Sequence, residues 1–157
     1  NLNNAVGIAD VLAMTRAGVK VGLGTDAMTL NMLEELRVAL FAQHLRQENP
    51  SAGFLEVTRA LFVNNPELAS RLWGFPLGTL AEWAAADLIL VDYDPPTPLD
   101  DGSVLGHLVF GLSQAPVDTT ICRGRVLMEG KRLDPDLDEA GVAARSRSLA
   151  RALWERF

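Results

Sequence analysis

Hydrophobic positions in the first third of the chain predict a helix, a buried strand and a second helix in succession. Apolar residues recur at helical spacing between residues 8 and 18, which predicts a helix of about 10 residues that ends at Gly18 in a left-handed conformation. Over residues 19–25, Val and Leu alternate with Gly and Lys, as is typical of a buried strand in an α/β unit. Leucines at helical spacing over residues 29–45 predict the next helix, which Asn31 begins as in a capping box. The short joints between these elements indicate a parallel α/β architecture.

Two more helices are expected before the middle of the chain. The first covers the apolar stretch from Phe54 to Val63. The second begins at "NNPE", where Asn65 is predicted to be the N-cap and Pro66 to occupy the first turn. Gly74 is predicted to end it, so this part of the chain is expected to be mainly helical.

The character of the sequence changes after Gly74. The segments "ADLILVDYD", "HLVFGL", "TTICRG" and "RVLMEG" are short, rich in β-branched and apolar residues and separated by Gly and Pro, which predicts antiparallel strands. From Asp138 the pattern returns to a helix with arginines on one side and an apolar stripe on the other, formed by Val142, Leu149, Leu153 and Phe157. No internal repeat is visible, which excludes repeat architectures.

Composition and charge narrow the class of protein. With 157 residues, of which 48% are hydrophobic, the chain is long enough for a folded domain with a core. A net charge of -6 argues against nucleic acid and anionic membrane surfaces as main partners, because both are bound through Lys and Arg. No apolar run reaches the roughly 18 residues of a membrane span, and a single cysteine fits the reducing cytoplasm. Since "NLNNAVG" lacks an initiator Met and the features of a signal peptide, we expect the chain to be a segment of a longer protein.

Asp26, in "VGLGTDAM", is the residue with the clearest chemical interest, and it has two interpretations. After a strand, an Asp commonly accepts backbone N–H bonds as a turn or helix-capping residue. In a parallel barrel, however, side chains at the carboxyl ends of the strands converge on the active site, where a carboxylate can bind a metal ion or take a proton from water. The spacing alone leaves both interpretations open.

Motifs over almost the whole chain resemble the C-terminal part of the amidohydrolase superfamily, in its cytosine deaminase and chlorohydrolase-like branch. They are "NLNNAVGIADVLAMTRAGVKVGLGTDAM", "PLGTLAEWAAADLILVDYDPPTP" and "GHLVFGLSQAPVDTTICRGRVLMEGKRL", in this order. The resemblance implies the C-terminal portion of a (β/α)8 barrel with part of a small β-sandwich domain. Residues 1–76 would then be the last βα units and trailing helices of the barrel, residues 77–133 the β-sandwich part, and residues 134–157 a C-terminal amphipathic helix. In "AEWAAADLI", Trp83 and Ala84 stand where the family has a glycine-containing turn.

The same resemblance implies site residues and a cofactor. Asp26 matches the carboxylate that closes strand eight, which binds metal and carries protons. Asn1, Asn3 and Asn4 match the end of the loop after strand seven, which borders the substrate pocket. The family's His-x-His and single histidine ligands would lie before the first residue of this sequence. We therefore expect a divalent metal, zinc or iron, in a full-length enzyme, and neither metal nor hydrolysis in this chain alone.

The remaining candidates for chemistry have structural interpretations. His44 is expected near a helix end at the surface, and His107 at the start of a strand, and neither is expected to bind metal. Cys122 is expected to be a buried filler. Three tryptophans are expected in the core or an interface (Trp73, Trp83, Trp154). Three carboxylates are expected in a solvated turn (Asp94, Asp100, Asp101).

Three hypotheses for the function follow. The first is a segment of a metal-dependent hydrolase that removes ammonia or chloride from a small heterocyclic substrate. The second is a non-catalytic folded remnant or partner module, and the third, which the length of the match disfavours, is an unrelated α/β binding protein. Because a lone barrel strand leaves its edges and the apolar faces of its helices uncovered, we expect self-association or binding to a complementing N-terminal chain.

Overall fold

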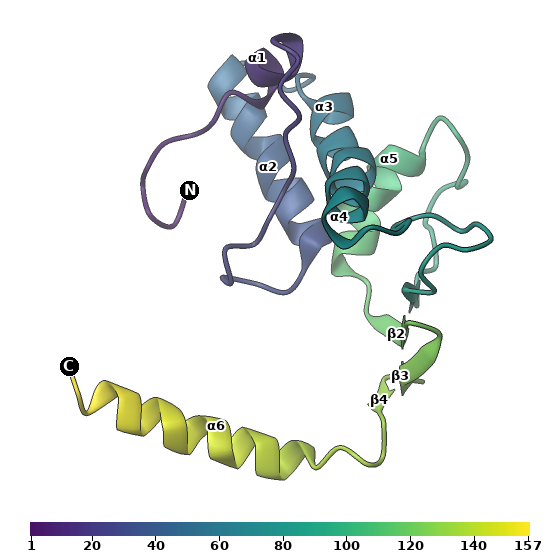
Figure 1. Cartoon of the computed structure of the whole chain (residues 1–157). Helices are drawn as coiled ribbons and strands as arrows, with labels where there is room; N and C mark the ends of the chain where they lie inside the picture. The colour runs from purple at the N-terminus through teal and green to yellow at the C-terminus, as the bar shows by residue number, and fades with distance from the viewer.

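The computed structural model describes all 157 residues, as a helical body, a small sheet and a long C-terminal helix (Figure 1). The helices are α1 (Val11–Arg16), α2 (Met32–Gln47), α3 (Phe54–Arg59), the π-helical turn η1 (Ala60–Asn64), α4 (Asn65–Trp73), α5 (Val104–Gly106), the π-helical turn η2 (His107–Gly111), the 3-10 turn η3 (Leu112–Gln114) and α6 (Glu139–Trp154). The strands are β1 (Leu88–Val91), β2 (Val117–Cys122), β3 (Arg125–Glu129) and β4 (Arg132–Leu133). None of the helices combines the length and apolar character that crossing a bilayer requires.

The helix boundaries follow from side-chain caps. Asp10 begins α1 by accepting a hydrogen bond from the backbone N–H of Ala13, and Gly18 follows the helix with a φ of 76°, as predicted. With these two limits α1 has 6 residues and is shorter than predicted. Asn31 caps α2 as predicted, through bonds from the backbone N–H groups of Leu33 and Glu34.

The prediction of a buried strand over residues 19–25 is wrong for this chain, because these residues belong to no strand and none of them is fully buried. The four strands of the structure form one sheet, and residues 19–25 are not part of it. The backbone groups of Val21 and Leu23 bond instead to the side chains of Asn64 and Asn65. The segment therefore packs against the core through Val21 and Leu23 without belonging to a sheet.

The two helices predicted over residues 54–74 form one continuous helical stretch, so Asn65 is not an N-cap. Pro66 has no N–H to donate to the preceding turn, and a π-helical turn, η1, joins α3 to α4 just before it. The side-chain oxygen of Asn65 accepts a hydrogen bond from the backbone N–H of Leu23 instead of capping the helix. Gly74 ends α4 with a φ of 79°, as predicted.

The sheet is antiparallel with the order β1-β2-β3-β4. Leu88 pairs with Ile121 across β1 and β2. Two-residue loops join β2 to β3 and β3 to β4, and all their central residues have positive φ, which matches the right-handed twist of the strands (Arg123, Gly124, Gly130, Lys131). The predicted strands at "ADLILVDYD", "TTICRG" and "RVLMEG" are therefore confirmed. A β-sandwich is not confirmed, because the structure has this one sheet.

The predicted strand at "HLVFGL" is wrong, because residues 107–111 form the π-helical turn η2. A short apolar run does not distinguish a strand from a buried helical turn. Here the turn packs against α2, which brings Val109 into the core and places Phe110 with its ring centroid 6.1 Å from that of Phe41. His107 is buried within η2 and bonds to Tyr93 and Thr97.

The core is small and lies between α1, α2, α3 and η2. Its buried apolar residues come from four elements that are distant in sequence (Val11, Leu36, Leu40, Val57, Val109). In total 13 of 157 residues are buried, so much apolar side-chain surface faces solvent. This is the exposure expected to favour association, and self-association stays a prediction.

One cysteine and three tryptophans lie at the surface instead of inside. Cys122, predicted to be buried, is exposed because it is the last residue of β2, beside the hairpin loop. Trp73, Trp83 and Trp154 are 59%, 92% and 71% exposed, so none is a core residue. Trp154 belongs to α6, which begins at the cap Asp138 as predicted and extends away from the helical body with no buried residue (Figure 1).

The three predicted turn carboxylates are solvated, as expected. Asp100 accepts hydrogen bonds from the backbone N–H groups of Gly102 and Ser103, and both Asp94 and Asp101 are exposed.

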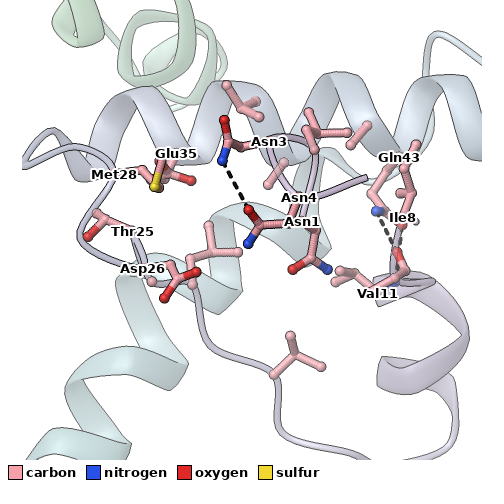
Figure 2. A pocket seen from close by; sticks show the side chains of 18 of the residues that line it. Asn1, Asn3, Asn4, Ile8, Val11, Thr25, Asp26, Met28, Glu35 and Gln43 are labelled. Atoms are coloured by element: carbon pink, nitrogen blue, oxygen red, sulfur yellow. Dashed lines mark hydrogen bonds between the residues drawn. The ribbon is translucent and has the colours of Figure 1, made fainter. Parts of the chain in front are cut away.

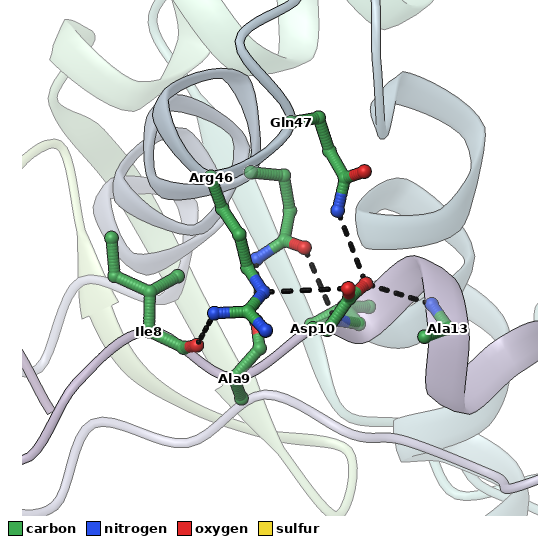
Figure 3. Close-up of polar contacts among 8 residues, drawn as sticks. Ile8, Ala9, Asp10, Ala13, Arg46 and Gln47 are labelled. Carbon is green, nitrogen blue, oxygen red and sulfur yellow. Dashed lines mark hydrogen bonds and ion pairs between the residues drawn. The ribbon is translucent and has the colours of Figure 1, made fainter.

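Asp10 also links α1 to α2. Its carboxylate contacts the side chains of Arg46 and Gln47 (Figure 3). The backbone N–H of Ala13 is the main cause that holds the pKa of Asp10 below its usual value of 3.8, and Gln47 and Arg46 add to this effect. Its charged form therefore stabilises the fold at pH values above the unfolded pKa, and the contribution is lost as the pH falls through the lower folded pKa.

We expect Asp10→Asn, which keeps a capping oxygen but removes the charge, to lower the thermal unfolding midpoint at neutral pH. The difference from wild type should close as the pH falls below about 3.8. Thermal melts between pH 7 and pH 3 measure this, and a difference that stays constant over that range would contradict the role given to the charge.

Candidate functional site

A cavity of about 390 Å³ lies between the N-terminal loop, the segment after α1 and one face of α2 (Figure 2). Asp26 lines it from the end of the extended segment, and Asn1, Asn3 and Asn4 line it from the N-terminal loop. The four residues that the sequence singled out as a site are thus brought together around one cavity.

Asp26 lies in a turn with unusual backbone geometry. Asp26 and Ala27 have φ values of 49° and 60°, and the N–H of Met28 donates to the carbonyl of Thr25 across the turn. A left-handed conformation costs roughly 1–2 kcal/mol in a residue that has a Cβ, and Asp tolerates it better than Ala. Strain of this kind occurs often at functional sites, where the surrounding structure maintains it. The turn leaves the Asp26 side chain exposed at the cavity.

The N-terminal loop is held by its own turn. The N–H of Ala5 donates to the carbonyl of Leu2, and the N–H of Val6 donates to the carbonyl of Asn1. The side-chain amide of Asn3 donates to that of Asn4 at 3.0 Å. Asn side chains both donate and accept hydrogen bonds, so this rim matches a ligand that carries both kinds of group.

Two polar residues of α2 that the sequence interpretation missed also line the cavity. Gln43 is 2% exposed and fastens the start of α1 to α2, because its amide accepts from the N–H of Val11 and donates to the carbonyl of Ala9. Glu35 is half-buried on the same side of the helix. The sequence does carry a signal for both residues: Glu35, Ala39 and Gln43 follow one another at i, i+4 spacing, which places them on one face of the helix.

The residues around the cavity do not by themselves fit a metal centre. Its charged lining residues are two carboxylates, Asp26 and Glu35, and no histidine lines it. No group of three or more His, Cys, Asp or Glu side chains in the structure could hold an ion. His44 lies near the end of α2 and His107 in η2, and both are outside the cavity lining.

Comparison with known proteins gives relatives along the whole chain. A model of the amidohydrolase family matches residues 1–127. The chain is 37% identical to a 5-methylthioadenosine/S-adenosylhomocysteine deaminase of Pelotomaculum thermopropionicum, over 99% of this chain and 36% of that protein. A protein of the same name from Desulforudis audaxviator is 36% identical over the same shares. The chain therefore spans about 36% of the length of these relatives.

Solved structures share the fold. A mutant of an atrazine chlorohydrolase from Arthrobacter aurescens, in complex with zinc and atraton, superposes with a TM-score of 0.71 and 26% identity, over 94% of this chain and 33% of that one. An adenosine deaminase from Xanthomonas campestris with bound zinc superposes with a TM-score of 0.74 and 24% identity, over 99% of this chain and 36% of that one. The relatives are named as hydrolases and deaminases, and with the family model matching residues 1–127, this chain belongs to the amidohydrolase family.

Proposed function

We propose that this chain is the C-terminal segment of a metal-dependent enzyme that removes the amino group of an adenosine-type nucleoside by hydrolysis. The observation that carries the proposal is the cavity where Asp26 and the asparagine rim meet. The names of the curated relatives, all deaminases of adenine nucleosides, favour this substrate class.

In the proposed reaction, water replaces the amino group on the heterocycle and ammonia leaves. Asp26 takes a proton from the attacking water and returns it to the departing amino group, so the carboxylate ends the cycle as it began. Asn1, Asn3 and Asn4 bind the nucleoside through their amide donors and acceptors. Release of chloride in place of ammonia is the second candidate, which the likeness to the atrazine chlorohydrolase supports.

The metal in this proposal is zinc, as in the related structures with bound zinc. Because two carboxylates and no histidine line the cavity, the remaining ligands would come from protein outside residues 1–157. The chain alone is then inactive. A non-catalytic remnant or partner module is the alternative, and it predicts no activity even when a complementing chain is supplied.

We expect the purified 157-residue chain to contain far less than one zinc ion per chain after dialysis, because a stable protein zinc site uses three or four ligands. Metal content by mass spectrometry measures this. The Asp26→Asn variant is the matched control and should have the same content. A stoichiometric metal that is lost in the variant would contradict the proposal that the site is completed from outside.

A further inference from the structure

The edge of the extended segment that leads to Asp26 is held by side chains that take the place of a neighbouring strand. Asn65 accepts a hydrogen bond from the N–H of Leu23 at 3.0 Å, and its amide nitrogen donates to the carbonyl of Leu23 at 2.8 Å. A residue of an antiparallel strand exchanges the same two bonds with its partner. Asn64 adds a third bond, from its amide nitrogen to the carbonyl of Val21 at 2.7 Å.

These contacts come from one junction in the helical body. Asn64 is the last residue of the π-helical turn η1, and Asn65 is the first of α4. Single π-helical turns occur often at functional sites. Further along α4, Glu67 pairs with Lys20, and this partner is the main cause that holds the pKa of Glu67 below its usual value. Side chains of η1 and α4 thus bind residues 20, 21 and 23 of the same segment through hydrogen bonds and one ion pair.

The sequence of the segment is adapted to this contact. A Cβ added at Gly22 would overlap the amide of Asn65, whereas a Cβ added at Gly24 would meet nothing within 4 Å. Val21 and Leu23 pack their side chains against the core cluster. The segment is therefore fixed on its apolar side by packing and on its polar edge by amides.

We infer that Asn65 is a positioning residue for Asp26. The inference rests on the function proposed above for Asp26. The carboxylate of Asp26 accepts no hydrogen bond from the chain, and its turn is left-handed, so its place at the cavity depends on how the backbone before it is held. Going along the chain toward Thr25 and Asp26, the hydrogen bonds of Asn65 to Leu23 are the last that a side chain makes to this backbone.

The first test compares Asn65→Ala with Ser70→Ala in the full-length enzyme. Ser70 lies on the same helix and accepts the N–H of Leu77, so its variant also loses a bond of α4 but touches nothing on the segment. We expect Asn65→Ala to lower kcat for ammonia release by about 10²-fold, since a misplacement of about 1 Å has that effect. KM should stay within about threefold, because the asparagine rim is unchanged. Ser70→Ala should change neither constant.

A second readout does not depend on activity. Hydrogen exchange at the Leu23 amide should become about tenfold faster in Asn65→Ala and remain unchanged in Ser70→Ala. If Asn65→Ala fails to fold, Gly22→Ala tests the same contact from the other side and should accelerate the same amide, while Gly24→Ala should not. Faster exchange with lower kcat and steady KM supports the inference.

Other outcomes overturn one or the other proposal. Unchanged exchange, or faster exchange with unchanged kcat, would refute Asn65 as a positioning residue. A wild-type enzyme that releases no ammonia would refute the proposed function, and the exchange data would then still decide whether Asn65 holds the segment.

Discussion

Asp26→Asn in the full-length enzyme is expected to lower kcat for ammonia release by about 10³-fold, which is within the range for loss of a general acid–base group. Asn has nearly the same shape and size but takes up no proton at working pH. The side chain is exposed at the cavity and has no hydrogen bond to the chain that its replacement would break. Steady-state kinetics with an ammonia-coupled assay measures the loss.

The control is Asp101→Asn, which makes the same chemical change on an exposed loop away from the cavity and should leave kcat as in wild type. Thermal melts of both variants should match wild type, so that loss of fold is excluded as the cause. If Asp26→Asn kept more than about a tenth of the wild-type kcat, Asp26 would not be the proton-carrying group.

Leu40→Ala is expected to lower the free energy of unfolding by about 3 kcal/mol, since it deletes buried methyl groups and leaves a cavity. Leu40 is 0% exposed and belongs to a core cluster of five buried residues. Because this core is small, few other contacts can compensate for the loss. Urea unfolding followed by circular dichroism measures the change through the midpoint and slope.

Leu45→Ala is the matched control, because it makes the same substitution on the same helix at a side chain that is 73% exposed. It should change the free energy of unfolding by less than about 0.5 kcal/mol. Equal losses in the two variants would show that the core does not lie where the structure has it.

Local signals in the sequence were sufficient for most helix ends and for the hairpins. Asn31 and Asp138 cap the two helices that they were expected to begin, and Gly18 and Gly74 follow the helices that they were expected to end. An N-cap depends on atoms within a few residues, so the sequence carries the whole signal. The cytosine deaminase-like resemblance gave the family, and the division at residues 76 and 133 stays a prediction.

Contacts between distant parts of the chain caused the errors. "HLVFGL" has the composition of a strand, yet Val109 meets α2 and the segment becomes helical. Asn65 has the sequence of an N-cap, yet its side chain bonds to Leu23, 42 residues earlier. Cys122 follows a β-branched run in the sequence, yet it is the last residue of β2 and the only exposed one of that strand. No local pattern contains these partners.

The residues of the candidate site also divide into those that local sequence motifs identify and those that depend on contacts between distant parts of the chain. Asp26 and the asparagines were found through motifs, whereas Gln43 and Glu35 join the cavity through the packing of α2 against residues 8–26. A buried Gln in a helix could have been noticed from its apolar neighbours. Its two partners, Ala9 and Val11, could not, because they depend on how the helices pack.

The measurement that tests the proposed function most directly is ammonia release by the zinc-loaded full-length enzyme from the compounds in its relatives' names, 5-methylthioadenosine and S-adenosylhomocysteine. We predict one ammonia for each nucleoside converted, and no release by residues 1–157 alone. No ammonia from any adenine nucleoside, together with chloride release from a chlorinated triazine, would contradict the deaminase assignment and favour the chlorohydrolase alternative.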